Sequence, residues 1–133
     1  MGSEAYESWP HKWFGIFQAD DGTEEGVPRF SEFVDVGWQP GDKLRIVEYL
    51  KSAPNVLSSS SLPTPCMICG AELGDPGSFF SDGEWLWPER LVHYMIEHDV
   101  RLPDEFVERI RKAEYKVSYE FDGDISSLPW PDV

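Results

Sequence analysis

The sequence is short of cysteine, histidine and basic residues, and it lacks any long apolar run. It contains 2 Cys, 3 His and 11 Lys or Arg among 133 residues, against 25 Asp or Glu. No stretch of about 18 apolar residues occurs, which excludes a membrane-spanning helix. The acidic, polar N-terminus lacks the basic and apolar regions of a secretory signal. We therefore expect a cytoplasmic protein with no membrane partner.

The shortage of basic residues bears on the class of partner. The formal net charge is −14, and the acidic surplus extends along the whole chain. Nucleic-acid affinity depends on clustered Lys and Arg that contact phosphates. The composition therefore argues against a nucleic-acid partner and favours a protein partner, in particular a basic one. Acidity also keeps small proteins in solution, so charge alone does not prove that a partner exists.

The two cysteines, Cys66 and Cys69, form a C-x2-C pair. Without an export signal, such a pair is poorly placed for a structural disulfide. The remaining uses are metal ligation, a redox motif, or burial as small apolar side chains. A redox CxxC opens a helix directly after a strand, whereas a Ser- and Pro-rich stretch precedes Cys66 and Gly70 follows Cys69. Metal ligation is the favoured interpretation.

Histidine supplies the remaining ligands of the expected metal site. His93 and His98 have H-x4-H spacing, and structural zinc sites combine C-x2-C and H-x3-5-H spacings in a tetrahedral array. Gly70 suits a tight knuckle in which backbone amides point at the sulfurs. The sequence therefore predicts a structural Zn²⁺ site formed by Cys66, Cys69, His93 and His98.

The spacing of the two histidines raises a geometric difficulty. Residues five apart on a regular α-helix lie about 140° apart around its axis, so His93 and His98 do not share a face. Either the helix ends or tightens before His98, or Glu97, on the same face as His93, is the fourth ligand. A water in the fourth position would instead make the site catalytic. Metalloprotease and zinc-deaminase signatures do not match the sequence.

Turn and cap signals predict an α+β fold with a small antiparallel sheet and about three helices. Asp82-Gly83 between two aromatic runs predicts a hairpin over 79–87, with Phe80 opposite Trp85. Alternating apolar residues predict a further strand over 116–121. We expect the first helix to follow an Asp42 N-cap and to bury Leu44, Val47 and Leu50, the second to begin at Pro88, and the third to begin near Pro103.

A chain of this length and composition predicts a single domain over 1–133. The N-terminal aromatic residues are more typical of a core than of a binding surface, and His11 is expected at the solvent. Within this domain we expect four regions: a loose N-terminal arm (1–11), a Ser- and Pro-rich loop (55–65), a zinc-binding knuckle-hairpin-helix core (66–112) and an acidic tail (122–133).

The segment from Cys66 to Val107 resembles a family of small bacterial zinc-knuckle-like proteins. The shared pattern is CxxCG, an aromatic-flanked DG, W-P-x-x-L-x-H-Y, a further His, and V-R-L-P-x-x-F. The resemblance implies a zinc-knuckle-like domain and no particular activity.

Together these features predict a non-enzymatic, zinc-stabilised acidic protein-interaction module, such as an adaptor or an immunity-type inhibitor. Two thiolates and two imidazoles would leave zinc no open position for a reacting water. The alternatives are a zinc-finger nucleic-acid-binding regulator and, less favoured, a zinc-dependent hydrolase.

Overall fold

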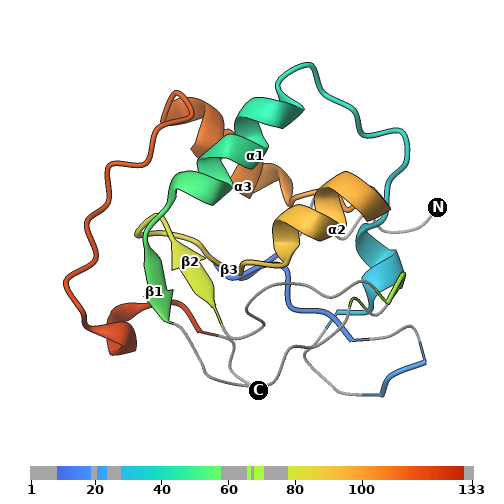
Figure 1. Ribbon diagram of the computed structural model, residues 1–133, viewed down its shortest axis with the longest axis horizontal. Helices are drawn as coiled ribbons and strands as arrows, with labels where there is room; N and C mark the ends of the chain where they lie inside the picture. The colour runs from blue at the N-terminus through green and yellow to red at the C-terminus, as the bar shows by residue number, and fades with distance from the viewer. Residues whose placement is uncertain are drawn as a thin grey trace.

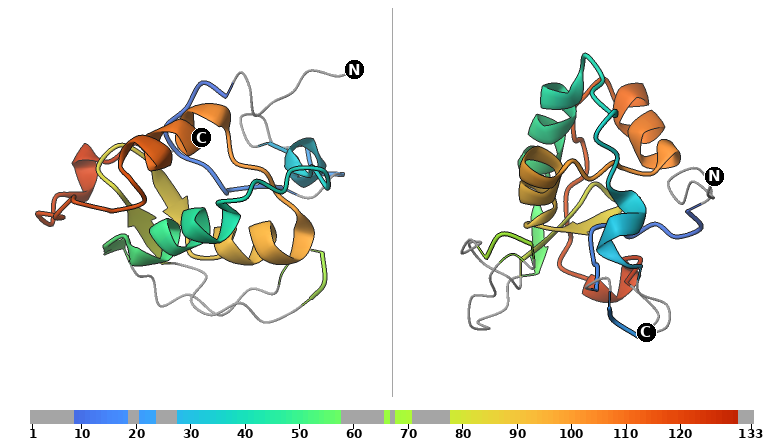
Figure 2. Two further views of the ribbon diagram at one scale, coloured as in Figure 1. Left: turned by 90° about the horizontal axis from the view of Figure 1, so that it is seen from above. Right: turned by 90° about the vertical axis from the view of Figure 1, so that its right-hand side faces the viewer.

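Three helices pack over a small antiparallel sheet in the computed structural model of the protein, which describes residues 9–18, 21–23, 28–57, 66, 68–70 and 78–130 (Figure 1). The strand order is β1-β2-β3, and the further views show the helices gathered on one side of the strands (Figure 2). This is an α+β fold, as predicted. The elements are, in chain order, a 3-10 helix (Phe30–Phe33), α1 (Lys43–Ser52), β1 (Asn55–Leu57), β2 (Phe79–Ser81), β3 (Leu86–Pro88), α2 (Leu91–His98), α3 (Asp104–Lys112) and a second 3-10 helix (Ile125–Ser127).

Two hydrophobic clusters lie on opposite faces of β3. Trp85, just before the strand, and Trp87 belong to the larger cluster, which contacts all three helices. The ring of Trp85 stacks on Phe106 with centroids 4.4 Å apart. Leu86 points the other way and packs with Trp13 in the smaller cluster. Successive side chains of a strand alternate between its faces, so β3 joins the two halves of the core.

The predicted hairpin forms, but with a wider loop than expected. Phe80 lies opposite Trp87, so the predicted pairing of Phe80 with Trp85 is wrong by two residues. The side chain of Asp82 explains the difference. Its Oδ1 accepts hydrogen bonds from the backbone N–H groups of Glu84 at 2.9 Å and Trp85 at 2.7 Å. These bonds close a longer loop and place the Trp85 ring in the core.

The third strand of the sheet is β1 and not the predicted strand over 116–121. β1 occupies the start of the segment expected to be a Ser- and Pro-rich loop, of which residues 58–65 lie outside the described part of the chain. Residues 116–121 have no strand assignment, although Tyr119 and Phe121 pack against the smaller cluster. Alternating burial accounts for that packing, whereas a strand also needs a neighbour with which to form ladder hydrogen bonds.

The helices form close to their predicted positions, with some differences at their starts. α2 begins at Leu91 rather than Pro88, because Pro88 ends β3. α3 follows Pro103 directly and buries Phe106 and Ile110, as the periodicity predicts. Among the described residues, no helix combines the length and apolar character that crossing a membrane requires.

The N-terminal aromatic residues belong to the core, as expected. Trp13 and Phe14 are buried. This segment pairs with β3, since the Phe14 N–H donates to the Leu86 carbonyl and the Leu86 N–H donates to the Lys12 carbonyl, both at 2.9 Å. His11 is exposed and stacks on Trp13 with ring centroids 5.0 Å apart. Residues 1–8 of the arm expected over 1–11 lie outside the described part of the chain. Trp9 is not loose, because it packs against both hydrophobic clusters and its Nε1 donates to the Trp13 carbonyl at 2.8 Å.

Asp42 occupies the N-cap position of α1, as predicted, but its side chain joins α1 to α3. No side-chain cap hydrogen bond forms at this position. The carboxylate instead accepts hydrogen bonds from Arg111 Nε at 2.9 Å, from Arg111 Nη2 at 3.0 Å and from the Tyr115 hydroxyl at 2.6 Å. The hydrogen bonds from Arg111, helped by the one from Tyr115, lower the pKa of Asp42 to about 2.

This contact should make stability depend on pH. Because the pKa of Asp42 in the folded protein, about 2, lies below its ordinary value of 3.8, its contribution is complete above that value and is lost as the pH falls towards 2. We expect Asp42→Asn to be about 1 kcal/mol less stable than the wild type at neutral pH. The difference should shrink as acid is added. Urea unfolding of both proteins across this range is the measurement, and a constant difference would contradict the assignment.

Candidate metal centre

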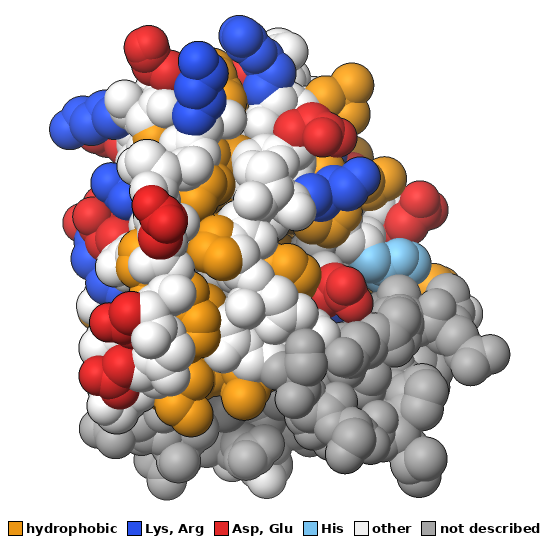
Figure 3. Space-filling model, turned by 60° about the vertical axis from the view of Figure 1, so that its left-hand side comes forward, with side chains coloured by type: hydrophobic (Ala, Val, Ile, Leu, Met, Phe, Trp, Pro, Cys, Tyr) orange, Lys and Arg blue, Asp and Glu red, His pale blue; other side chains and the backbone are white. Residues whose placement is uncertain are grey.

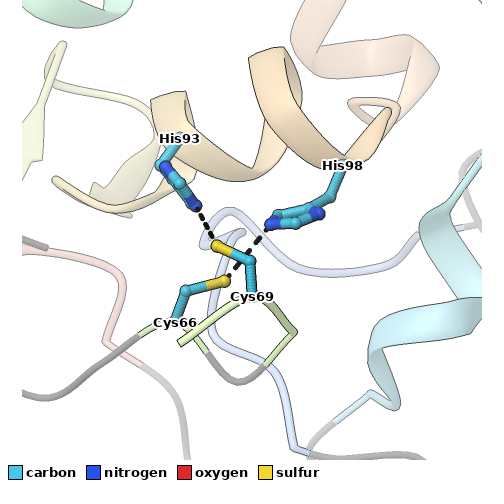
Figure 4. A group of neighbouring side chains, drawn as sticks. All are labelled: Cys66, Cys69, His93 and His98. Carbon is cyan, nitrogen blue, oxygen red and sulfur yellow. Dashed lines mark hydrogen bonds between the residues drawn. The ribbon is translucent and has the colours of Figure 1, made fainter. Parts of the chain in front are cut away.

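The side chains of Cys66, Cys69, His93 and His98 converge in the structure (Figure 4). One ligand atom from each residue lies within 4.8 Å of those of the other three. His98 Nε2 is 3.3 Å from Cys66 Sγ, and His93 Nε2 is 3.6 Å from Cys69 Sγ. Figure 4 shows both imidazoles projecting from α2 towards the sulfurs of the cysteine segment. The four residues named from sequence spacing are therefore brought together.

These distances fit a single tetrahedral ion. Bond lengths of about 2.3 Å to sulfur and about 2.0–2.1 Å to nitrogen place tetrahedral S and N ligand atoms about 3.5 Å apart. The two sulfur–nitrogen distances of 3.3 and 3.6 Å lie on either side of that value. Thiolate and imidazole are also the donors that zinc and several other transition metals accept. The four residues could therefore hold one metal ion.

A tight turn presents the two sulfurs. The Gly70 N–H donates to the Cys66 carbonyl at 3.0 Å, and the Ile68 N–H donates to Cys66 Sγ at 3.4 Å. The predicted amide-to-sulfur contact is thus present at Cys66, and such contacts support a ligating sulfur. Gly70 has a φ of +74°, a backbone conformation that glycine adopts without strain.

Replacing Gly70 should weaken metal binding. Gly70→Ala keeps the turn only by holding an L-residue in the left-handed region, at about 1–2 kcal/mol. Because metal binding requires this turn, we expect metal affinity to fall about five- to thirtyfold. Competition with a chromophoric chelator measures the metal affinity. Gly41→Ala is the matched control, since its φ lies outside the left-handed region and a Cβ there meets nothing within 4 Å. Equal affinities in the two variants would contradict this role of the turn.

The end of α2 brings His98 to the same side as His93. Asp99 adopts a left-handed conformation, with φ 57° and ψ 32°, and its N–H donates to the Tyr94 carbonyl five residues back. The Val100 N–H bonds to the same carbonyl at 3.2 Å. A bond to the fifth preceding residue opens a wide, π-type turn, in which each residue rotates by less than the usual ~100°. The helix includes His98, so the option that it ends or tightens before His98 is wrong, and its last turn widens instead.

Glu97, the alternative fourth ligand, lies outside this group. Its side chain is exposed. Among the described residues, the group of potential ligands contains the two cysteines and the two histidines alone. The geometry thus favours His98 over Glu97 at the fourth position.

The group lies where the cysteine segment meets the core. Cys66 is buried and belongs to the larger hydrophobic cluster, Cys69 is exposed, and both histidines are half-buried. The His98 ring lies beside Phe30 and Tyr94, with centroids 6.1 and 6.3 Å away. An ion held here would fasten the cysteine segment to α2 and to the aromatic residues beneath it.

The chain was compared with protein-family models, with curated proteins and with solved structures. None of the three comparisons found a match. The function is therefore inferred from the metal-ligand group and from the surface.

Proposed function

We propose that the protein is a non-enzymatic protein-interaction module whose fold is stabilised by a structural zinc ion at Cys66, Cys69, His93 and His98. The observation that supports this most is the convergence of one ligand atom from each of these four residues to within 4.8 Å of one another. A catalytic zinc site keeps three protein ligands and leaves the fourth position to a water. Four protein ligands fill the coordination shell, so the ion has a structural role.

Zinc is the ion that best fits this role. Two thiolates and two imidazoles form one of the common structural zinc sets. Zinc also has no redox chemistry and imposes no geometry of its own, so it suits a site in which the protein supplies the tetrahedral arrangement.

The other close groups of charged residues support structural roles as well. The carboxylate of Asp82 is fully buried and contacts the hydroxyl of Tyr49 and the guanidinium of Arg109. Lys12 contacts the carboxylates of Glu84 and Glu105 at the surface. These contacts pair opposite charges and satisfy polar groups, which is how charges stabilise a fold. Because a filled zinc shell leaves no position for a reacting water, we propose an adaptor or an immunity-type inhibitor rather than a hydrolase.

Reconstitution with a partner tests this function. The zinc-loaded protein, used as bait in an extract of its native host at physiological salt, should recover a protein that then binds the purified chain at a fixed ratio. Metal-free Cys66→Ser should lose that binding, because the fold that presents the surface depends on the ion. Zinc-dependent turnover of a peptide, ester or phosphoester, lost in Cys66→Ser, would contradict the proposal, as would the absence of any partner.

A further inference from the structure

Leu44 on α1 is an apolar side chain that the fold leaves at the surface. It is 75% exposed, although the helical periodicity predicts its burial. It lines a hollow of about 400 Å³ between α1 and α2, whose apolar lining includes Pro40, Val47 and Ile96. Ile96 is itself half exposed. An apolar ridge beside an apolar hollow is typical of a surface that receives a side chain from another molecule.

A second hollow, of about 360 Å³, lies on the other side of Leu44. It separates α1 from the segment after α3, and Arg45, Tyr115 and Lys116 line it together with Leu44. The Arg45 guanidinium lies over the ring of Tyr115, 4.5 Å from its centroid. Leu44 therefore stands between a largely apolar hollow and a charged hollow, which is lined by the cations Arg45 and Lys116 and by the carboxylates of Glu48 and Glu114.

The cations around Leu44 lack carboxylate partners. Among the described residues, Lys43, Arg45 and Lys116 form no ion pair, whereas Arg109 and Arg111 on α3 are both paired with aspartates. The nearest polar contact of Lys43 is the Gln39 side-chain oxygen at 3.4 Å. The chain has 25 acidic residues against 11 basic ones, so unpaired cations at one place stand out. Figure 3 shows basic side chains at the top of the face drawn, interspersed with acidic ones, and hydrophobic side chains reaching the surface among them.

We propose that this region, the Leu44 surface, binds a short acidic amphipathic segment of a protein partner. We define it as Leu44, the two hollows beside it and the cations Lys43, Arg45 and Lys116. Apolar side chains of the segment pack against Leu44 and enter the hollow between α1 and α2, and its carboxylates pair with the three cations. The inference rests on the proposed function and adds the surface and the class of partner. The partner proposed here is acidic, whereas the total charge of the protein favours a basic partner. The local charge decides, because electrostatic contact acts at short range.

A peptide fits this surface better than a nucleic acid does. Single-stranded nucleic acids need a continuous basic groove and free aromatic faces for stacking. Here Glu48 and Glu114 line the same hollow as Arg45, and the guanidinium of Arg45 already covers the ring of Tyr115. An evenly charged phosphate backbone would meet both carboxylates. A peptide can place its own carboxylates at the cations alone.

Two matched peptides test the inference. One is an amphipathic helical peptide of about 16 residues built from Leu and Glu, and the other has Lys at each Glu position. Fluorescence anisotropy with the zinc-loaded full chain should show saturable binding of the Glu peptide, at least about tenfold tighter than the Lys peptide and weaker as salt is raised. Failure of the Glu peptide to bind, binding of the Lys peptide at equal strength, or tighter binding of single-stranded DNA would overturn the inference.

Variants locate the binding site. Leu44→Ala should weaken binding of the Glu peptide about tenfold, and combined charge reversal of Lys43, Arg45 and Lys116 to Glu should weaken it by at least as much. Ile125→Ala is the matched control, because Ile125 is another exposed aliphatic side chain and lies in the second 3-10 helix. Both Leu44→Ala and Ile125→Ala should keep the wild-type melting temperature. Equal binding by Leu44→Ala and wild type would overturn the inference.

Binding of a host partner to wild type and to Leu44→Ala separates this inference from the proposed function. A host partner that binds wild type and Leu44→Ala equally would overturn the Leu44 surface and leave the interaction function standing. A partner that binds wild type and loses affinity for Leu44→Ala supports both. Absence of any host partner would contradict the proposed function even where the Glu peptide binds at Leu44.

Discussion

Removal of the metal should unfold much of the protein. Zinc at a structural site of this kind contributes about 10–16 kcal/mol of apparent binding free energy at neutral pH, whereas a domain of this size is stable by only about 5–15 kcal/mol in total. A strong chelator should therefore lower the melting temperature by more than about 10 °C or abolish the cooperative transition. Thermal melts followed by circular dichroism, with and without chelator, measure this.

Variants at the histidines give the matched control. His93→Ala removes one of the four grouped ligand atoms and should resemble the chelated protein. His11→Ala removes the same kind of side chain from an exposed position, where it stacks on Trp13, and should change stability by about 1 kcal/mol at most. A melting curve that neither chelator nor His93→Ala shifts would exclude a structural metal.

Replacement of Asp82 by alanine should be the most damaging change away from the metal centre. Its buried carboxylate accepts a hydrogen bond from the Tyr49 hydroxyl at 2.5 Å and another from Arg109 Nε at 3.3 Å. It also holds the backbone N–H groups of Glu84 and Trp85. Asp82→Ala removes the buried carboxylate that pairs with Arg109 and leaves the Tyr49 hydroxyl and the two backbone N–H groups without their acceptor, which costs about 3–5 kcal/mol. Urea unfolding of the two proteins gives the difference.

Two further variants separate the parts of this network. Tyr49→Phe removes one hydrogen bond and should cost about 1–2 kcal/mol. Burial raises the pKa of Tyr49, and the hydrogen bond to Asp82 raises it further, so the hydroxyl stays a donor in mildly alkaline solution. Asp122→Ala, at an exposed position, should have an effect within about 0.5 kcal/mol. A loss below about 1 kcal/mol in Asp82→Ala would show that the loop does not depend on this carboxylate.

The sequence predicted the elements of the fold better than their pairing. Turn residues and periodicity located the hairpin and the three helices, because these signals act over a few residues. The hairpin register depends instead on Asp82 bonding to the backbone of Trp85 while the Trp85 ring stacks on Phe106 of α3. The strand expected over 116–121 failed for a similar reason, since alternation cannot show which neighbour is present.

Burial on α1 was also only partly predictable. The apolar positions of the helix fit two overlapping stripes, one with Leu44 and one with Tyr49. The second is the buried one, because the Tyr49 hydroxyl reaches Asp82 and its ring stacks on Trp87. That choice depends on residues more than 30 positions away, and it leaves Leu44 at the surface.

The candidate site was predictable in its members and not in its geometry. Soft donors in C-x2-C and H-x4-H spacing identify a metal-ligand set by chemistry alone. The wide last turn of α2 that brings the two histidines together is marked by the hydrogen bond from the Asp99 N–H to the Tyr94 carbonyl, five residues back. Nothing in the spacing of His93 and His98 indicates that turn.

X-ray absorption at the zinc edge tests the central claim most directly. Protein purified without chelator should contain one zinc per chain, with two sulfur ligands at about 2.3 Å and two nitrogen ligands at about 2.0–2.1 Å. His93→Ala should lose one nitrogen ligand, whereas His11→Ala should keep all four ligands. Folded wild-type protein that lacks a transition metal, or a zinc with an oxygen ligand in place of one of these four, would contradict the account.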